Sequence, residues 1–137
     1  MSTGKYEKQI KREPIEFEKI PGINLASVHL NKDWGEQKFR MGWFCVNKPM
    51  LMVPEAHAHD FDQIVCFIGG DSTNMKDFGA EVEFYLGEEG EKYIINTTSI
   101  VYIPKGLVHG PLNFVRVDKP ILFNDMFFAE AYSQIKK

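Results

Sequence analysis

Short apolar or alternating stretches recur along the whole chain, each about as long as one β-strand. Residues 15–20 (IEFEKI) alternate between apolar and charged side chains with a period of two, which is typical of a strand with one exposed face. Further strands are predicted at 24–30, 41–46, 50–53, 63–68, 81–86, 92–95, 99–103, 114–117 and 121–128. Because no segment carries a sustained helical period, the pattern favours an all-β sandwich or barrel.

The two ends of the chain and one internal stretch differ from this pattern. Residues 1–14 are polar and predict an N-terminal arm, followed by a single domain over 15–137. The last residues, 129–137 (AEAYSQIKK), form a short tail in which one or two helical turns are expected. The stretch Asp71–Gly79 predicts a long surface loop, and whether it acts as a lid over a site stays open.

Composition and charge narrow the class of protein. The chain has 137 residues, 44% of them hydrophobic and 26% charged, which is usual for a globular domain with its own core. Aromatic residues make up 13%, which suggests a thick core or an aromatic-lined cavity. The net charge of -3 and the lack of a basic block argue against a nucleic-acid partner. The longest apolar stretches are far shorter than a membrane span, so no membrane partner is expected.

The cysteines and the N-terminal residues bear on the cellular compartment. Cys45 and Cys66 are the only cysteines, and both lie in apolar stretches, where a free buried thiol is the commoner state. A disulfide between them is not excluded by the sequence. The charged N-terminus lacks the apolar segment of a secretory signal. These features together predict reduced thiols and a cytoplasmic protein.

Two short stretches carry candidate metal chemistry. His57 and His59 lie two residues apart, so in an extended strand their imidazoles share one face, and Gln63 keeps the same parity if the strand runs on unbroken. The stretch 104–109 (PKGLVH) supplies a third imidazole, His109, after a Pro/Gly turn. Three imidazoles and an amide oxygen are a plausible ligand set for a divalent transition metal.

These stretches resemble the paired motifs of the cupin superfamily. The first motif reads H-x-H, then three or four residues, Glu, six residues and Gly; the second reads P-x-G-x-x-H-x-x-x-N. The matching positions are His57, His59, Gln63 in place of the Glu, Gly70, Pro104, Gly106, His109 and Asn113. The similarity runs from about residue 49 to residue 117. It implies a small single-domain, RmlC-like cupin, that is, a double-stranded β-helix or jelly-roll barrel.

The resemblance also implies a ligand set and a cofactor. His57, His59 and His109 would be metal ligands, and Gln63 is a candidate fourth; the ion could be Zn, Fe, Mn, Ni or Co. Since Gln63 stands where the family has a glutamate, the site would carry one more positive charge, attract anionic substrates and disfavour oxygen-activating chemistry. Alternatively, Gln63 does not coordinate, and water completes the shell of the three imidazoles.

Several residues could act beside such an ion. Glu81 and Glu83 share one face of a predicted strand, where they are either a general base or a solvated strand face. Asn113 shares the second motif with His109 and is expected to point inward. The fourth histidine, His29, is interpreted as an ordinary, partly buried strand residue.

Two functions are compatible with this reading. The first is a small metal-dependent enzyme that polarises a carbonyl or enolate oxygen of a small polar or carboxylated molecule: an isomerase, lyase or hydrolase rather than a dioxygenase. The second is a non-catalytic module that binds a small molecule or senses a metal. By resemblance, a homodimer is expected, in which residues 15–20 could add a strand to a partner's sheet.

Overall fold

Strands make up nearly all of the regular structure. A computed structural model describes residues 4–20, 23–30, 38–129 and 135–136. Along the chain the elements are η1 (Glu7–Gln9), a single 3-10 turn, and then β1 (Ile15–Ile20), β2 (Ile23–Leu30), β3 (Arg40–Val46), β4 (Met50–Val53), β5 (His57–Ala58), β6 (Gln63–Gly69), β7 (Ala80–Leu86), β8 (Glu91–Ile95), β9 (Ser99–Ile103), β10 (His109–Val117), β11 (Ile121–Phe127) and β12 (Ile135–Lys136). Among the described residues, no helix is long and apolar enough to cross a membrane.

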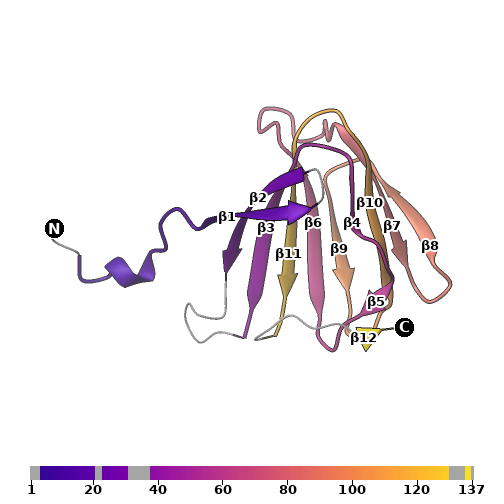
Figure 1. The fold of residues 1–137 in the computed structure, drawn as a ribbon, viewed down its shortest axis with the longest axis horizontal. Helices are drawn as coiled ribbons and strands as arrows, with labels where there is room; N and C mark the ends of the chain where they lie inside the picture. The colour runs from indigo at the N-terminus through magenta and orange to yellow at the C-terminus, as the bar shows by residue number, and fades with distance from the viewer. Residues whose placement is uncertain (1–3, 21–22, 31–37, 130–134, 137) are drawn as a thin grey trace.

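The strands form two antiparallel sheets that pack as a jelly-roll sandwich (Figure 1). The first sheet has the order β1-β2-β3-β11-β6-β9. The second has the order β12-β5-β10-β7-β8, and β4 also pairs with β10. The predicted all-β jelly-roll class is therefore confirmed.

The core lies between the inner faces of the two sheets. Phe67 on β6 is fully buried, and its ring centroid lies 5.1 Å from that of Phe123, 6.1 Å from Phe84 and 6.2 Å from Phe114. These four rings come from four strands of both sheets, so they join the sheets across the sandwich. Burying one such side chain stabilises the fold by roughly 1.5–3 kcal/mol.

Two local predictions are corrected by the structure. The chain does not run as one strand from His59 to Gln63: β5 belongs to the second sheet and β6 to the first, so the parity argument does not apply there. In the C-terminal tail, residues 135–136 form β12 rather than helix, because they pair with the edge of β5. Residues 130–134 and 137 of that tail lie outside the described part of the chain.

The two cysteines have free thiols, as expected. Only Cys66 is buried, whereas Cys45 on β3 is exposed, so the prediction that both are buried is wrong for Cys45. Burial raises the pKa of the Cys66 thiol, which keeps it in the protonated, less reactive form.

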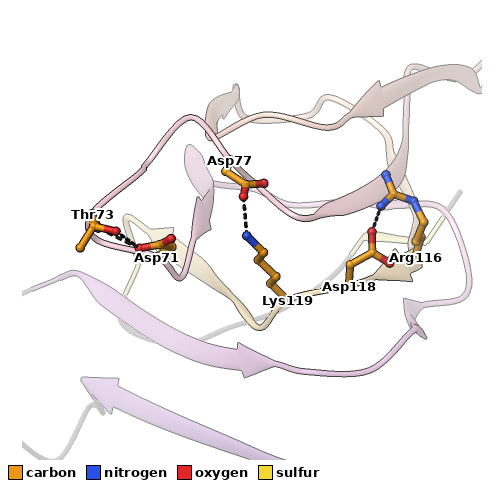
Figure 2. Close-up of polar contacts among 6 residues, drawn as sticks. All are labelled: Asp71, Thr73, Asp77, Arg116, Asp118 and Lys119. Atoms are coloured by element: carbon orange, nitrogen blue, oxygen red, sulfur yellow. Dashed lines mark hydrogen bonds and ion pairs between the residues drawn. The ribbon is translucent and has the colours of Figure 1, made fainter.

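The loop Asp71–Gly79 is fixed by local polar contacts (Figure 2). A side-chain oxygen of Asp71 accepts hydrogen bonds from the backbone N–H and the hydroxyl of Thr73, at 2.9 and 2.6 Å. Asp77 pairs with Lys119 in the turn between β10 and β11. The loop follows the last residue of β6, whereas β5, which carries His57, lies at the opposite end of the sandwich, near the first residue of β6 (Figure 1). The loop is therefore at the wrong end of the sandwich to act as a lid over His57.

Candidate metal centre

Three histidines from two separate parts of the chain meet inside one end of the sandwich. His57 on β5 pairs in register with His109, the first residue of β10, and His59 directly follows β5. The ring centroids are 4.5–5.0 Å apart. One nitrogen from each ring lies within 4.8 Å of the others, and all three residues are buried. Two nitrogens bound to one ion at ~2.0–2.1 Å are at most about 4 Å apart, so only small ring movements separate this cluster from a coordinating one.

Two glycines allow the histidine segments to approach each other. Gly106 has a φ of +86°, and its N–H donates a 2.9 Å hydrogen bond to the carbonyl of His59, which ties the two motifs together. Gly110 has a φ of +101°, and a Cβ there would come 2.9 Å from the carbonyl oxygen of Glu55. A side chain at position 110 would therefore push His109 away from the segment that carries His57.

Backbone carbonyls orient two of the rings. Nδ1 of His109 lies 2.9 Å from the carbonyl oxygen of Leu107, and Nδ1 of His57 lies 3.2 Å from that of Glu55. Because a carbonyl can only accept, Nδ1 carries the proton in both contacts, and the lone pair is on Nε2. Such a contact to the second ring nitrogen is usual for histidines that bind metals.

Burial keeps the ring of His109 neutral. The pKa of His109 falls to about 4, mainly through loss of solvation and also through the neighbouring His57 and His59, although the hydrogen bond to Leu107 opposes the change. At neutral pH, His109 is therefore in the form that can donate a lone pair to a metal ion.

Aromatic rings border the cluster on one side. Phe61 stacks on His59 with a centroid distance of 4.6 Å and an interplanar angle of 12°. Phe127 lies behind it, 5.2 Å from Phe61. This apolar wall limits the positions of the His59 ring and excludes water from that side.

Gln63 offers a fourth donor atom at the same end of the sandwich. The side chain is 5% exposed, and its Nε2 donates a 2.6 Å hydrogen bond to a carboxylate oxygen of Asp125 on β11. Its Oε1 is buried and has no hydrogen-bond partner among the described residues. A buried amide oxygen without a partner is costly, so the atom suits a cation or a water molecule as its partner. The three buried imidazoles by themselves are a donor set that fits a divalent transition metal.

The sequence interpretation missed Asp125. Its side chain has the same parity as those of Phe123 and Phe127, so it lies on the inner face of β11. Burial raises the pKa of its carboxyl group to about 6, while the hydrogen bond from Gln63 and the nearby His29 act in the opposite direction. The available signal was a single charge within the apolar stretch 121–128 (ILFNDMFF).

His29 lies on the inner face of β2, partly buried as predicted. Its Nε2 lies 3.0 Å from the hydroxyl of Ser27, and its ring meets Phe44 edge-on at 5.2 Å. It is not a member of the three-histidine cluster. Its electrostatic interaction with Asp125 lowers the pKa of that carboxyl group.

The candidate acid–base residues lie on the other face of the second sheet. Val82 and Phe84 are buried in the core, so the alternate side chains Glu81 and Glu83 on β7 face outward, where Glu83 pairs with Lys92 at 3.6 Å. Asn113 sits beside Glu83 in register. The prediction that Asn113 points inward is wrong, because the residues on either side of it in β10 are the buried ones.

Comparisons with solved structures identify the fold. The polyketide cyclase RemF from Streptomyces resistomycificus matches with a TM-score of 0.61 and 15% identity over 93% of this chain and 82% of its own. A mutant of Bacillus subtilis oxalate decarboxylase matches with a TM-score of 0.60 and 12% identity over 89% of this chain and 30% of its own. KdgF from Halomonas sp. matches with a TM-score of 0.54 and 15% identity over 82% of this chain and 86% of its own.

These neighbours are cupin proteins, and the chain has their jelly-roll fold. The chain spans about a third of the length of the oxalate decarboxylase, in which another structure describes Mn(II) centres. No protein-family model and no curated protein matches the sequence. At these identities, the comparisons carry the fold alone.

Proposed function

Because the chain has a cupin fold with three buried imidazoles meeting in its interior, we propose that it is a metal-dependent enzyme acting on a small polar or carboxylated molecule. The three-histidine cluster carries this proposal, since it brings one nitrogen from each of three buried rings within 4.8 Å of the others, as a shared metal ion requires. A bound divalent ion would polarise a carbonyl or enolate oxygen of the substrate.

The chain's own residues would hold the ion and shape the site. His57, His59 and His109 would donate through their ring nitrogens, and the carbonyls of Glu55 and Leu107 would keep two of the rings in place. All these ligands are neutral, so the site would attract an anionic substrate. Because Glu81, Glu83 and Asn113 face outward, we assign none of them an acid–base role.

Metal content is the first test. Protein purified without a histidine tag should contain about one transition-metal ion per chain by elemental analysis. His57→Ala and His109→Ala should each remove it, while His29→Gln, which changes the one histidine outside the cluster, should retain it. Equal metal content in the His57 variant and the wild type would show that the ion is held elsewhere. The Mn(II) centres of oxalate decarboxylase make Mn the first ion to add back, followed by Zn, Fe, Ni and Co.

A substrate panel then separates an enzyme from a binding module. It should contain small carboxylates, keto acids and sugars. Turnover that a chelator abolishes and one metal restores supports the enzyme. Saturable binding without turnover supports the alternative, a non-catalytic module that binds a small molecule or senses a metal.

We also propose a homodimer that uses β1. This strand is at the edge of the first sheet, and Ile15 and Phe17 on it are exposed. An exposed edge strand can pair with another chain. Light scattering during size-exclusion chromatography should give twice the monomer mass, and a monomer at all concentrations contradicts the proposal.

A further inference from the structure

The buried amide of Gln63, at the same end of the sandwich as the histidines, has a hydrogen-bond partner for its nitrogen but none for its oxygen among the described residues. Nε2 of Gln63 donates to Asp125 at 2.6 Å, whereas Oε1 is buried and has no hydrogen-bond partner within the described part of the chain. The contact joins residues 62 positions apart in the sequence, so it depends on the register between β6 and β11 rather than on local structure.

The Asp125 carboxylate decides which way the amide points. An amide has one end that only donates and one end that only accepts, and a carboxylate oxygen accepts. Turning the amide over would place two acceptor oxygens against each other. It would also direct the NH₂ group, which cannot bind a cation, to the side where Oε1 now lies. The amide therefore has one favourable orientation as long as Asp125 is present.

The surrounding strands hold Asp125 in this place. In register it lies between Val65 on β6 and Gly42 on β3, and Gln63 is the diagonal neighbour two residues before Val65. Gly42 leaves room on that side for His29: a Cβ at position 42 would come 2.9 Å from Nδ1 of His29. The carboxyl group thus sits in a narrow space between a histidine and the amide of Gln63.

We propose that Asp125 is a positioning residue, which fixes the amide of Gln63 so that its Oε1 serves as the fourth metal ligand beside the three imidazoles. This inference rests on the proposed metal site. It assigns a role to Asp125, which would not contact the ion itself. Gln63 stands where the resemblance leads one to expect a glutamate, and the carboxylate of Asp125 on the neighbouring strand would orient the amide of Gln63. Such partners of metal ligands typically change metal affinity by about 10–100-fold when they are removed.

The test is a Co²⁺ titration of the metal-free protein against a chromophoric chelator, together with the visible spectrum of the bound Co²⁺. Asp125→Leu removes the acceptor and places an apolar group of similar size at a partly buried position. It should weaken Co²⁺ binding by about 10–100-fold and change the spectrum. Asp125→Asn keeps an acceptor oxygen and should recover part of the loss. Asp125→Ala is the second variant if the leucine variant does not fold, as judged by circular dichroism.

The decisive comparison uses Gln63→Leu. If Asp125 acts through the amide, adding Asp125→Leu to Gln63→Leu should change Co²⁺ affinity by less than about twofold. The matched control is Asp118→Asn, an exposed aspartate paired with Arg116 in the turn before β11 (Figure 2), which should leave affinity unchanged.

Two results would overturn the inference. One is wild-type affinity in both Asp125→Leu and Asp125→Ala. The other is a full loss from Asp125→Leu in the Gln63→Leu background, since Asp125 would then act without the amide. Failure of the proposed function is distinguishable, because in that case the wild-type protein itself does not bind Co²⁺.

Discussion

The opposing pKa changes of Asp125 and His109 predict how the stability of the metal-free protein depends on pH. Burial raises the pKa of the Asp125 carboxyl group from 3.8 to about 6. Between these values the folded protein holds a proton that the unfolded chain has lost, so its stability is highest at low pH and falls as pH rises toward 6. At about 1.4 kcal/mol per pKa unit, the full loss is about 3 kcal/mol.

The perturbation that isolates this effect is Asp125→Asn, because asparagine has a similar shape and does not ionise. The free energy of unfolding is measured by urea denaturation of both proteins at several pH values, with a chelator present. The difference, variant minus wild type, should grow by about 3 kcal/mol between pH 3 and pH 7. Groups that titrate alike in both proteins cancel in this difference.

In the Asp125→Asn protein, the titration of His109 determines how stability depends on pH in this range. The pKa of His109 falls from 6.5 to about 4, so the unfolded chain takes up a proton in this range that the folded protein refuses. Stability from this group is therefore present above pH 6.5 and is lost as pH falls toward 4. The Asp125→Asn protein should become more stable as pH rises through this window, whereas the wild type, in which the two slopes oppose each other, should change less.

One result would refute this reasoning: a difference between variant and wild type that stays constant, or shrinks, from pH 3 to pH 7. It would mean that the Asp125 carboxyl is ionised in the fold without cost. Asp118→Asn serves as the control, because it removes an exposed carboxylate at the other end of β10, and its difference should stay within about 0.5 kcal/mol.

Three further predictions concern the core, the Gly42 position and the metal. Phe67→Ala should lower the free energy of unfolding by about 3–5 kcal/mol, whereas Ile100→Ala, 73% exposed, should change it by less than about 0.5; similar losses in urea would contradict the assigned core. Gly42→Ala should cost about 1–3 kcal/mol, and less in a His29→Ala background, because its Cβ meets the His29 ring; equal costs would exclude that clash. A metal at a hundred times its Kd should stabilise the wild type by about 2.7 kcal/mol but leave His109→Ala unchanged; equal shifts would contradict the site.

The strands were predictable because their signals are local. Alternation at 15–20 and turn residues between the apolar stretches are read directly from neighbouring positions, and β1, β4 and β9 begin and end where the sequence indicates. The convergence of His57, His59 and His109 was also expected, since two of them share a strand-like spacing and the third follows a Pro/Gly turn.

What the sequence did not reveal depends on pairing between distant segments. The chain passes from one sheet to the other just before Gln63, and no local signal indicates this change. The sequence of 57–69 is equally compatible with a single strand that has a polar interruption. The strand at Ile135–Lys136 exists only because β5 leaves an edge free. The outward position of Asn113 follows from which of its neighbours are buried, and that is set by the whole of β10.

Asp125 is the most consequential of these cases. A charge within the apolar stretch 121–128 suggests either a strand defect or a buried partner, and the sequence offers no way to choose between them. The register of β11 against β6 makes the choice, by bringing the carboxylate to the amide of Gln63. A glutamine at position 63 taken alone would remove a carboxylate from the site. In the proposed site, Asp125 would keep a carboxylate one hydrogen bond behind the amide of Gln63. The ligands of the ion would then all be neutral, and the amide would keep a defined orientation.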